Sequence, residues 1–439
     1  MTAVLEPTLA PLPLALPAVE RRAVMPSGFT AAATAVGIKA SRGPDLAIVA
    51  ADGSASHAGV PVAAIFTMNA LPAAPVRLSR QHLAATLPSG GGGYGWTRGI
   101  VATSGSANAA TGDSGDVDQA QIASLFAEAL GAKPEETLAL STGVIGTRLP
   151  VRAVGDGIAD LVPRLSASDE ALAAVAEAIC TTDSRIKVAT VSVAVESSGD
   201  EAATSFRVSG LAKGVGMIHP HMATMLSVVL TDARAEPALL HDILRSSATR
   251  TWNQLSVDGD SSTNDTVFLL ASGAAGGQSM QQGSQAARAL AAGVEAVARD
   301  LARQQAADGE GATTLITCQA SGARTDIAAR AVARAVVSSS LVKTAVHGRD
   351  PNWGRIAAAA GNAGVEIDPN RLRIAIAATL VFDGSAGGPL AFDRDAARAA
   401  MDAPELLVRL DLGSGAGMGE AFGCDLTEAY VVENSEYTT

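Results

Sequence analysis

The segment from Lys213 to Leu230 constrains this chain more than any other part of its sequence. It begins with two glycines, Gly214 and Gly216, and it ends in the apolar run Met225-Leu-Ser-Val-Val-Leu230. Glycine favours turns because it adopts left-handed backbone angles at little steric cost, whereas β-branched residues favour strands. The pattern therefore predicts a loop that leads directly into a buried strand.

A threonine stands where the predicted loop meets the strand. Thr224 directly follows the small residue Ala223. A threonine hydroxyl is a weak nucleophile unless a base removes its proton, and cleavage just before the threonine would provide its own α-amine as that base. The pKa of an ordinary α-amine is about 7.7–8.0, which suits a base near neutral pH. The same hydroxyl can perform the cleavage by attacking the Ala223 carbonyl. From these residues alone, a plain strand that contains a threonine is the competing interpretation.

The composition narrows the class of protein. The 439 residues are 48% hydrophobic but only 3% aromatic, which predicts a tightly packed aliphatic core and excludes disorder. The net charge is −12 and the basic residues form no cluster, so nucleic acids and anionic membranes are unexpected partners. Cys180, Cys318 and Cys424 are widely separated, which is typical of a reducing compartment and predicts neither disulfides nor a zinc site.

Residues 1–26 are rich in proline, and we expect a flexible extension there. The apolar segment Pro7–Val19 contains four prolines and no basic residue before it, so it does not resemble a secretory signal. The uncharged run Thr266–Ala287 is rich in Gly, Gln and Ser, unlike a membrane span. These features predict a cytoplasmic protein.

Hydrophobic periodicity predicts several elements of secondary structure. We expect strands at Asp45–Val49 and Ala63–Thr67, and helices at Asp116–Leu130, Glu236–Leu255 and Ser284–Ala307.

The segment from Lys213 to Leu226 resembles the KGxGMIxPxMATML signature of the ornithine acetyltransferase family, also called glutamate N-acetyltransferase or ArgJ. The resemblance extends in about nine ordered blocks from about Gly28 to Thr439. The other blocks include Phe66–Val76, Val101–Gly112, Leu140–Gly146, Thr181–Lys187, Val257–Thr266, Glu310–Thr313, Asp350–Ile356 and a C-terminal block made of Gly423–Thr427 with Asn434–Thr438.

This resemblance implies an α+β fold of stacked sheets and helices in two lobes, of the ornithine acetyltransferase/DmpA-like type. It further implies self-cleavage into an α chain, residues 27–223, and a β chain, residues 224–439, assembled as an α2β2 heterotetramer. No metal or organic cofactor is implied.

The implied reaction is acetyl transfer from N2-acetyl-L-ornithine to L-glutamate in arginine biosynthesis. Thr224 takes the acetyl group as an ester and glutamate then attacks that ester, in a ping-pong cycle. Some members of the family also use acetyl-CoA. The alternatives are an acyltransferase of a secondary-metabolite pathway, an N-terminal-nucleophile aminopeptidase or amidohydrolase that uses the same threonine, and an uncleaved binding protein.

The resemblance also assigns roles to individual residues. Thr142 and Gly143 would form the oxyanion hole, since a hydroxyl and a backbone N–H at a glycine turn can converge on one developing charge. Lys213 would bind a substrate carboxylate or screen charge, and Glu310 suits the cationic amine of ornithine. The remaining implied substrate-binding residues are Thr181, Thr224, Asn434 and Thr438. Thr182, next to Thr181, leaves the choice of hydroxyl open.

Several positions depart from the family pattern. Thr103, Ser106, Ser184, His221 and Thr314 stand where other residues are usual. Changes at Thr103 and Ser106 would alter either the site or only the turn, and we expect those at His221 and Thr314 to tune the acceptor preference. A histidine base is a further alternative. His219 and His221 lie an odd number of residues from Thr224, so in an extended segment they would point to the opposite face. The Asp-rich loop at 258–265 lacks the closing glutamate of an EF-hand, which argues against calcium.

Overall fold

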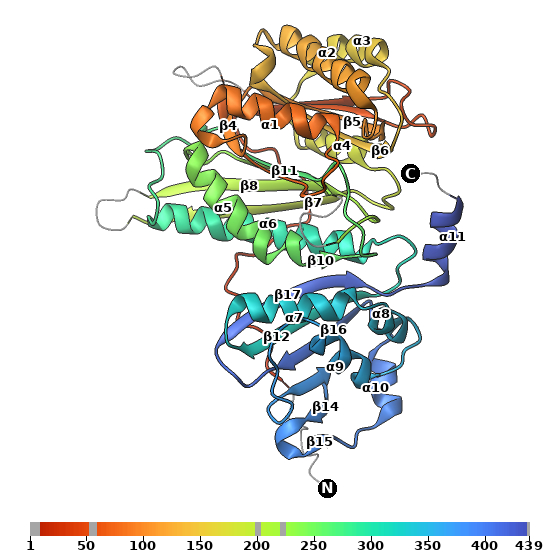
Figure 1. Ribbon diagram of the computed structural model, residues 1–439. Helices are drawn as coiled ribbons and strands as arrows, with labels where there is room; N and C mark the ends of the chain where they lie inside the picture. The colour runs from red at the N-terminus through yellow and green to blue at the C-terminus, as the bar shows by residue number, and fades with distance from the viewer. Residues whose placement is uncertain (1–8, 52–58, 198–202, 220–224, 437–439) are drawn as a thin grey trace.

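The computed structural model describes residues 9–51, 59–197, 203–219 and 225–436. Within these residues, three β-sheets and their covering helices form two lobes (Figure 1). The upper lobe in this view contains a four-stranded and a six-stranded sheet, and the lower lobe contains a seven-stranded sheet. The predicted α+β class with stacked sheets and helices is therefore confirmed.

The four-stranded sheet begins the upper lobe. Its strand order is β1-β2-β5-β6, with only β5 and β6 parallel. The strands are β1 (Phe29–Thr34), β2 (Leu46–Ala51), β5 (Gly99–Ser106) and β6 (Thr137–Val144). Helices α2 (Gly112–Leu130) and α3 (Val151–Leu161) pack on its outer face, where Ile122, Phe126 and Ile158 are fully buried. Gly131 ends α2 in the left-handed conformation, so the helix ends at Leu130, as predicted.

The six-stranded sheet lies beneath the four-stranded sheet. Its order is β4 (Tyr94–Thr97), β3 (Val60–Phe66), β11 (Thr266–Ala271), β9 (Leu226–Thr231), β8 (Thr204–Lys213) and β7 (Lys187–Val195). Side chains alternate between two cores along β9: Leu226, Val228 and Leu230 face the four-stranded sheet, whereas Val229 faces the helices on the other side. The strand predicted at Met225–Leu230 is thus buried on both faces, which is why it is continuously apolar.

Helices complete the upper lobe as a helix–sheet–sheet–helix sandwich. α5 (Pro237–Arg250) and α6 (Gln285–Ala307) cover the free face of the six-stranded sheet, and Ser284 caps α6. α1 (Ala74–Thr86) and α4 (Asp169–Ile179) pack beside the two sheets. The helix predicted to reach Leu255 ends at Arg250, because Leu255 and Ser256 form the short strand β10, which pairs with Phe422 and Gly423.

The seven-stranded sheet forms the lower lobe together with α7 (Asp326–Ser338), α8 (Ser340–His347), α9 (Trp353–Gly361) and α10 (Arg394–Ala400). Helix α7 packs on β12 and β17. The strand order is β10-β17-β12-β16-β13-β14-β15, and the strands not yet given are β12 (Leu315–Ala323), β13 (Arg373–Ile376), β14 (Thr379–Asp383), β15 (Gly388–Pro389), β16 (Glu405–Asp411) and β17 (Gly417–Cys424). The chain then returns to the upper lobe with α11 (Glu428–Glu436).

The N-terminal segment differs from the expected flexible extension over its described part, residues 9–26. Leu9 is buried against Ala375 and Leu380 of the lower lobe. Glu20 forms a β-bridge with Thr190 of β7, and Arg21 forms an ion pair with Asp300 of α6 at 2.9 Å. Apolar burial and backbone pairing hold this proline-rich segment in place, so it connects the two lobes.

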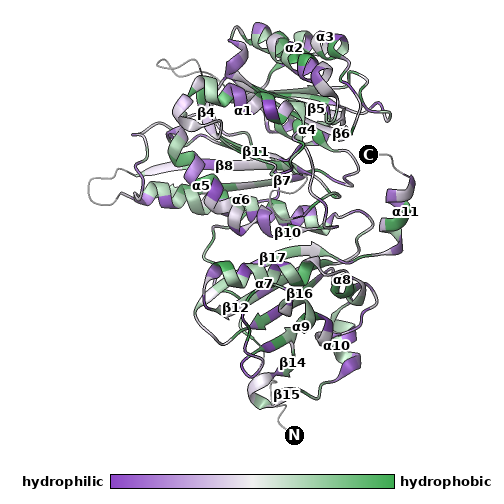
Figure 2. Ribbon diagram, in the orientation of Figure 1, coloured by the Kyte–Doolittle hydropathy of each residue, from purple (hydrophilic) through white to green (hydrophobic). Residues whose placement is uncertain are grey.

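Figure 2 shows that helices such as α2 and α3 carry both hydrophilic and hydrophobic residues along their length. In the described part of the chain, no helix has the length and apolarity needed to span a membrane.

Candidate active site

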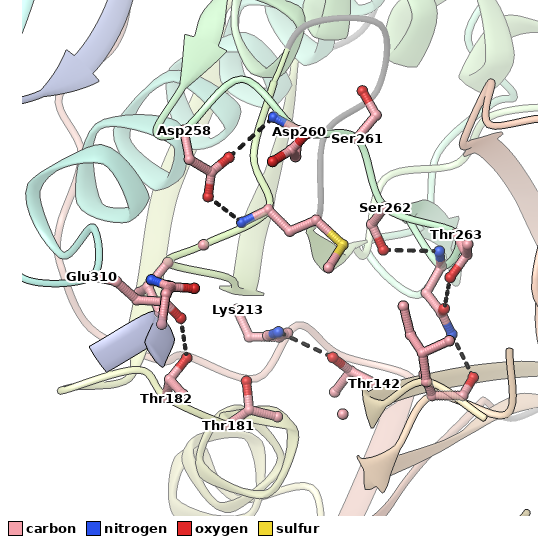
Figure 3. Close-up of a pocket in the computed structure, with 18 of the residues that line it drawn as sticks. Thr142, Thr181, Thr182, Lys213, Asp258, Asp260, Ser261, Ser262, Thr263 and Glu310 are labelled. Carbon is pink, nitrogen blue, oxygen red and sulfur yellow. Dashed lines mark hydrogen bonds between the residues drawn. The ribbon is translucent and has the colours of Figure 1, made fainter. Parts of the chain in front are cut away.

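A cavity of about 380 Å³ brings together most of the site residues predicted from the sequence. Six of them line it: Thr142, Gly143, Thr181, Lys213, Glu310 and Asn434. Figure 3 shows the cavity with Lys213 directed toward Thr142 and Thr182 directed toward Glu310. The other three, Ala223, Thr224 and Thr438, lie outside the described residues. Met225, which follows Thr224 in the sequence, is buried, and its N–H donates to Asp265 Oδ1 at 2.9 Å.

The predicted oxyanion pair lies at the end of β6. Gly143 has φ +123°, and a Cβ atom at this position would lie 2.3 Å from the carbonyl carbon of Gly105 on the neighbouring strand β5. Only glycine fits such an approach without strain. The neighbouring Thr142 is buried and lines the cavity.

Lys213 ends strand β8 and reaches the oxyanion pair. It is paired with Leu226 of β9, which starts two residues after Thr224 in the sequence. Its Nζ donates to Thr142 Oγ1 at 3.0 Å, and its backbone carbonyl accepts from Gln305 Nε2 at 2.9 Å. Only 5% of Lys213 is exposed, so the ammonium group lies at the cavity wall rather than in bulk solvent.

A buried ionic cluster behind the cavity was not predicted from the sequence. Asp183 Oδ1 accepts from Lys187 Nζ at 2.6 Å and from the Gly214 N–H at 2.9 Å, and its Oδ2 accepts from the Thr181 N–H at 3.1 Å. Burial alone would raise the pKa of Asp183, but the charges of Lys213 and Lys187 and these hydrogen bonds lower it. Asp183 therefore links the two segments that carry Thr181 and Lys213. The only feature of the sequence that could have indicated a role for Asp183 is its position inside the block Thr181–Lys187.

Glu310 is held at the opposite side of the cavity. Its Oε1 accepts from Thr182 Oγ1 at 3.0 Å, and its Oε2 accepts from Asn434 Nδ2 at 2.9 Å. A Cβ atom at Gly216 would lie 2.3 Å from Glu310 Oε2, so the glycine makes room for this carboxylate. Of the two adjacent threonine hydroxyls, the one that contacts Glu310 belongs to Thr182, although Thr181 also lines the cavity.

Further acidic groups make one side of the cavity negative. Asp258 accepts from the N–H groups of Met217 and Ile218, and burial raises the pKa of its carboxyl group. Burial together with the nearby charges of Asp258 and Glu310 raises the pKa of Tyr430 to about 12. The cavity thus has acidic groups on one side and the Lys213 ammonium on the other, which fits a zwitterionic amino acid.

The Asp-rich loop at 258–265 packs against the wall of the cavity. Asp258 is engaged by backbone N–H groups, and Asn264 Nδ2 donates to the carbonyls of Ala107 and Ser141 at 2.7 and 2.8 Å. The loop therefore holds the cavity wall against β6. Across the residues that the structure describes, no three His, Cys, Asp or Glu side chains are grouped to hold a metal ion.

Of the positions that depart from the family pattern, four are described, and none of the four is among the residues that line the cavity: Thr103, Ser106, Ser184 and Thr314. Thr103 Oγ1 is 2.8 Å from Ser141 Oγ, and Ser106 Oγ donates to the Thr147 carbonyl at 2.8 Å. Ser184 binds Asp308. The buried Thr314 hydroxyl has no hydrogen-bond partner in the described part of the chain.

Only one of the two candidate histidine bases lies within the described residues. His221 lies outside the described residues. His219 Nδ1 is 3.2 Å from Ser256 Oγ, and His219 is absent from the described lining of the cavity.

The family model and the curated relatives both point to the ArgJ family. The model of the ArgJ family matches residues 30–439. The arginine biosynthesis bifunctional protein ArgJ of Thermus thermophilus is 44% identical over 94% of this chain and 99% of its own. The protein of the same name from Synechococcus is 43% identical over 94% of this chain and 96% of its own. A crystal structure of the Bacillus halodurans protein of that name aligns with 47% of this chain and 96% of the solved chain, at 38% identity and a TM-score of 0.46.

Proposed function

Because this chain belongs to the ArgJ family, we propose that it moves an acetyl group from N2-acetyl-L-ornithine to L-glutamate through an acetyl ester on Thr224. The chain is an acyltransferase of arginine biosynthesis, like the curated relatives that match nearly its whole length. The observation that carries the proposed substrate class is the division of charge in the cavity. Asp258, Asp260 and Glu310 suit the cationic amine of ornithine, and Lys213 suits a carboxylate.

Maturation is the first proposed step. The Thr224 hydroxyl attacks the Ala223 carbonyl, the peptide C–N bond breaks, and the chain is held by an ester to the threonine oxygen. Water then hydrolyses this ester, which leaves a carboxylate on Ala223 and a free α-amine on Thr224. The products are residues 1–223 and residues 224–439. The new amine provides the base that a threonine hydroxyl needs.

Acetyl transfer follows in two half-reactions. The α-amine accepts the Thr224 hydroxyl proton while the oxygen attacks the acetyl carbonyl of N-acetylornithine. The Thr142 hydroxyl and the Gly143 N–H stabilise the resulting oxyanion. The acetyl C–N bond then breaks, the leaving amine takes the proton, and ornithine departs. The amine of glutamate attacks the ester in the same way and leaves as N-acetylglutamate, which restores the Thr224 hydroxyl.

The proposal assigns binding roles to Thr181, Lys213, Glu310, Asn434 and Thr438, and the first four of these line the cavity. It includes an α2β2 assembly of the cleavage products and requires neither a metal nor an organic cofactor. Acetyl-CoA is a second proposed acetyl donor. We place the protein in the cytoplasm, since its three cysteines are free thiols, as a reducing compartment would keep them.

Intact-mass measurement of the denatured, purified protein tests the proposal. We expect two fragments, the second beginning with Thr224, and a single uncleaved chain in the Thr224→Ala variant. After incubation with N-acetylornithine alone, the second fragment should gain the mass of one acetyl group. Addition of glutamate should remove it and form N-acetylglutamate. Release of free acetate with no acetylated glutamate would instead identify a hydrolase.

A further inference from the structure

The contact between Lys213 and Thr142 determines the direction of a hydrogen bond. An ammonium group has only donors, whereas a hydroxyl has one proton and can accept as well. At the 3.0 Å separation of Lys213 Nζ and Thr142 Oγ1, the threonine oxygen must therefore be the acceptor. The hydroxyl proton consequently points elsewhere. Within the described residues, no acceptor is recorded for it.

The backbone of Lys213 is held in place by its surroundings. It pairs with Leu226 of β9, its carbonyl accepts from the side chain of Gln305 of α6, and the N–H of the next residue, Gly214, donates to Asp183. Asp183 is itself bound by Lys187, so its carboxylate is already satisfied by another cation and by two backbone N–H groups. The one recorded hydrogen bond of Lys213 Nζ among the described residues goes to Thr142.

The direction of this hydrogen bond matters for catalysis. A hydroxyl that accepts from a cation is polarised, so it becomes a stronger donor to a developing negative charge. A hydroxyl without such a partner can rotate and present its oxygen to the oxyanion, which would be repulsive. A donor whose orientation is set in advance needs no reorganisation during the reaction.

We propose that Lys213 is a positioning residue of the oxyanion hole, which holds the Thr142 hydroxyl so that its proton faces the developing oxyanion. This inference rests on the proposed acetyl transfer through Thr224. It differs from the substrate-binding role, because it acts on the rate of the chemical step rather than on the affinity for a substrate carboxylate.

A double-mutant cycle separates the two roles. The variants are Lys213→Met, which keeps an unbranched apolar stem but removes the ammonium group, Thr142→Val, which keeps the shape of the threonine, and the double variant. The readout is the single-turnover rate of acetylation of the 224–439 fragment by N-acetylornithine, measured by intact mass over a range of substrate concentrations. We expect Thr142→Val to slow acetylation about 100-fold. Lys213→Met should slow it at least about tenfold, the effect of losing a hydrogen bond to a charged group.

The proposal requires that the rate reductions caused by Lys213→Met and Thr142→Val do not multiply in the double variant. In the Thr142→Val background, Lys213→Met should change the saturated rate by no more than about twofold, the usual limit of additivity errors. Equal losses in both backgrounds would overturn the inference. A Lys213→Met effect confined to the half-saturating substrate concentration would overturn it as well, and would favour carboxylate binding.

Thr182→Val provides the matched control. It removes a hydroxyl that lines the same cavity but donates to Glu310 rather than contacting Lys213. The rate reduction caused by Thr182→Val should multiply with that caused by Lys213→Met when the two are combined. If a variant matures too slowly to supply the cleaved fragment, the same cycle is measured on the rate of self-cleavage, in which the oxygen of the Ala223 carbonyl becomes the oxyanion. A wild-type protein that never becomes acetylated would reject the proposed function, whereas acetylation with multiplying losses would reject this inference alone.

Discussion

Gly143 lies near the end of β6 and Gly146 lies in the turn that follows, and of these two glycines only Gly143 is packed against another strand. A Cβ atom at Gly143 would lie 2.3 Å from Gly105, whereas one at Gly146 would have no atom within 4 Å. Both have positive φ, +123° and +85°. We expect Gly143→Ala to displace the oxyanion N–H and to lower kcat by about 100-fold. Gly146→Ala should cost only about 1 kcal/mol of stability from backbone strain. Steady-state kinetics and thermal melting of both variants test this, and an unchanged kcat in Gly143→Ala would contradict it.

Asp265 makes the stability of the fold depend on pH. It is fully buried, and this burial raises the pKa of its carboxyl group well above the ordinary value. The folded state therefore retains a proton that the unfolded state releases above about pH 4. Stability should fall as pH rises from there toward the folded pKa, by up to about 1.4 kcal/mol per pH unit. Asp265→Asn should lack this slope.

Urea unfolding at pH 5 and pH 7 measures the effect of Asp265. Both proteins carry Thr224→Ala, so that the chain stays in one piece. The difference in unfolding free energy between the Asp265 protein and the Asp265→Asn protein should shift in favour of the asparagine variant at the higher pH. A constant difference would show that Asp265 does not titrate in this range.

At the residue scale, the sequence predicted the site through motif resemblance rather than through physics. Thr142, Lys213 and Glu310 come from segments far apart in the chain, and they line one cavity. The contacts among them were not predictable. Asp183 occurs inside a recognised block, yet its role depends on Gly214, which becomes its neighbour only after folding.

At the element scale, helix α11 is held by few contacts although it contributes to the cavity. None of its residues is buried. Asn434 Nδ2 donates to Glu310 Oε2 at 2.9 Å, and Glu428 Oε2 lies 3.1 Å from His347 Nε2. Helices without a buried face open easily. We therefore expect the amide protons of α11 to exchange faster than those of α6, whose inner face is buried.

Asn434→Ala should increase exchange in α11 further and raise KM for N-acetylornithine, because Glu310 loses a partner. Ser435→Ala is the matched control, since the Ser435 hydroxyl donates only to Val432 within the same helix in the described structure. Hydrogen exchange followed by mass spectrometry, together with steady-state kinetics, gives both readouts. Equal exchange and equal KM in the two variants would exclude a role of the Asn434–Glu310 contact.

The same helix shows which elements a sequence reveals. The helices at 112–130 and 285–307 have an apolar face and a capping residue or terminal glycine, and both were predicted nearly to their ends. Helix α11 has no apolar face, and the two-residue strand β10 is too short to show alternation. Such elements are set by tertiary contacts, which one sequence does not display.

For the whole molecule, the order of the strands could not be predicted from the sequence, because neighbouring strands in a sheet come from distant segments of the chain. In the six-stranded sheet, β11 pairs with β3 about 200 residues earlier in the chain, counting from the register Thr266 with Phe66. The same order shows how the proposed cleavage products are connected. β9 and β11 belong to residues 224–439, and they lie between β3 and β8, which belong to residues 1–223.

The interleaved strands predict that cleavage does not release either fragment. Backbone hydrogen bonds join β9 to β8 on one side and β11 to β3 on the other, and two hydrophobic cores lie above and below these strands. Separation would expose both cores, so it should require unfolding of the upper lobe. Size-exclusion chromatography of the matured protein should give one peak that contains both fragments. In increasing urea, the fragments should separate only as the tertiary signal is lost, because they share one cooperative unit. Elution of one fragment alone before that transition would contradict the interleaved arrangement.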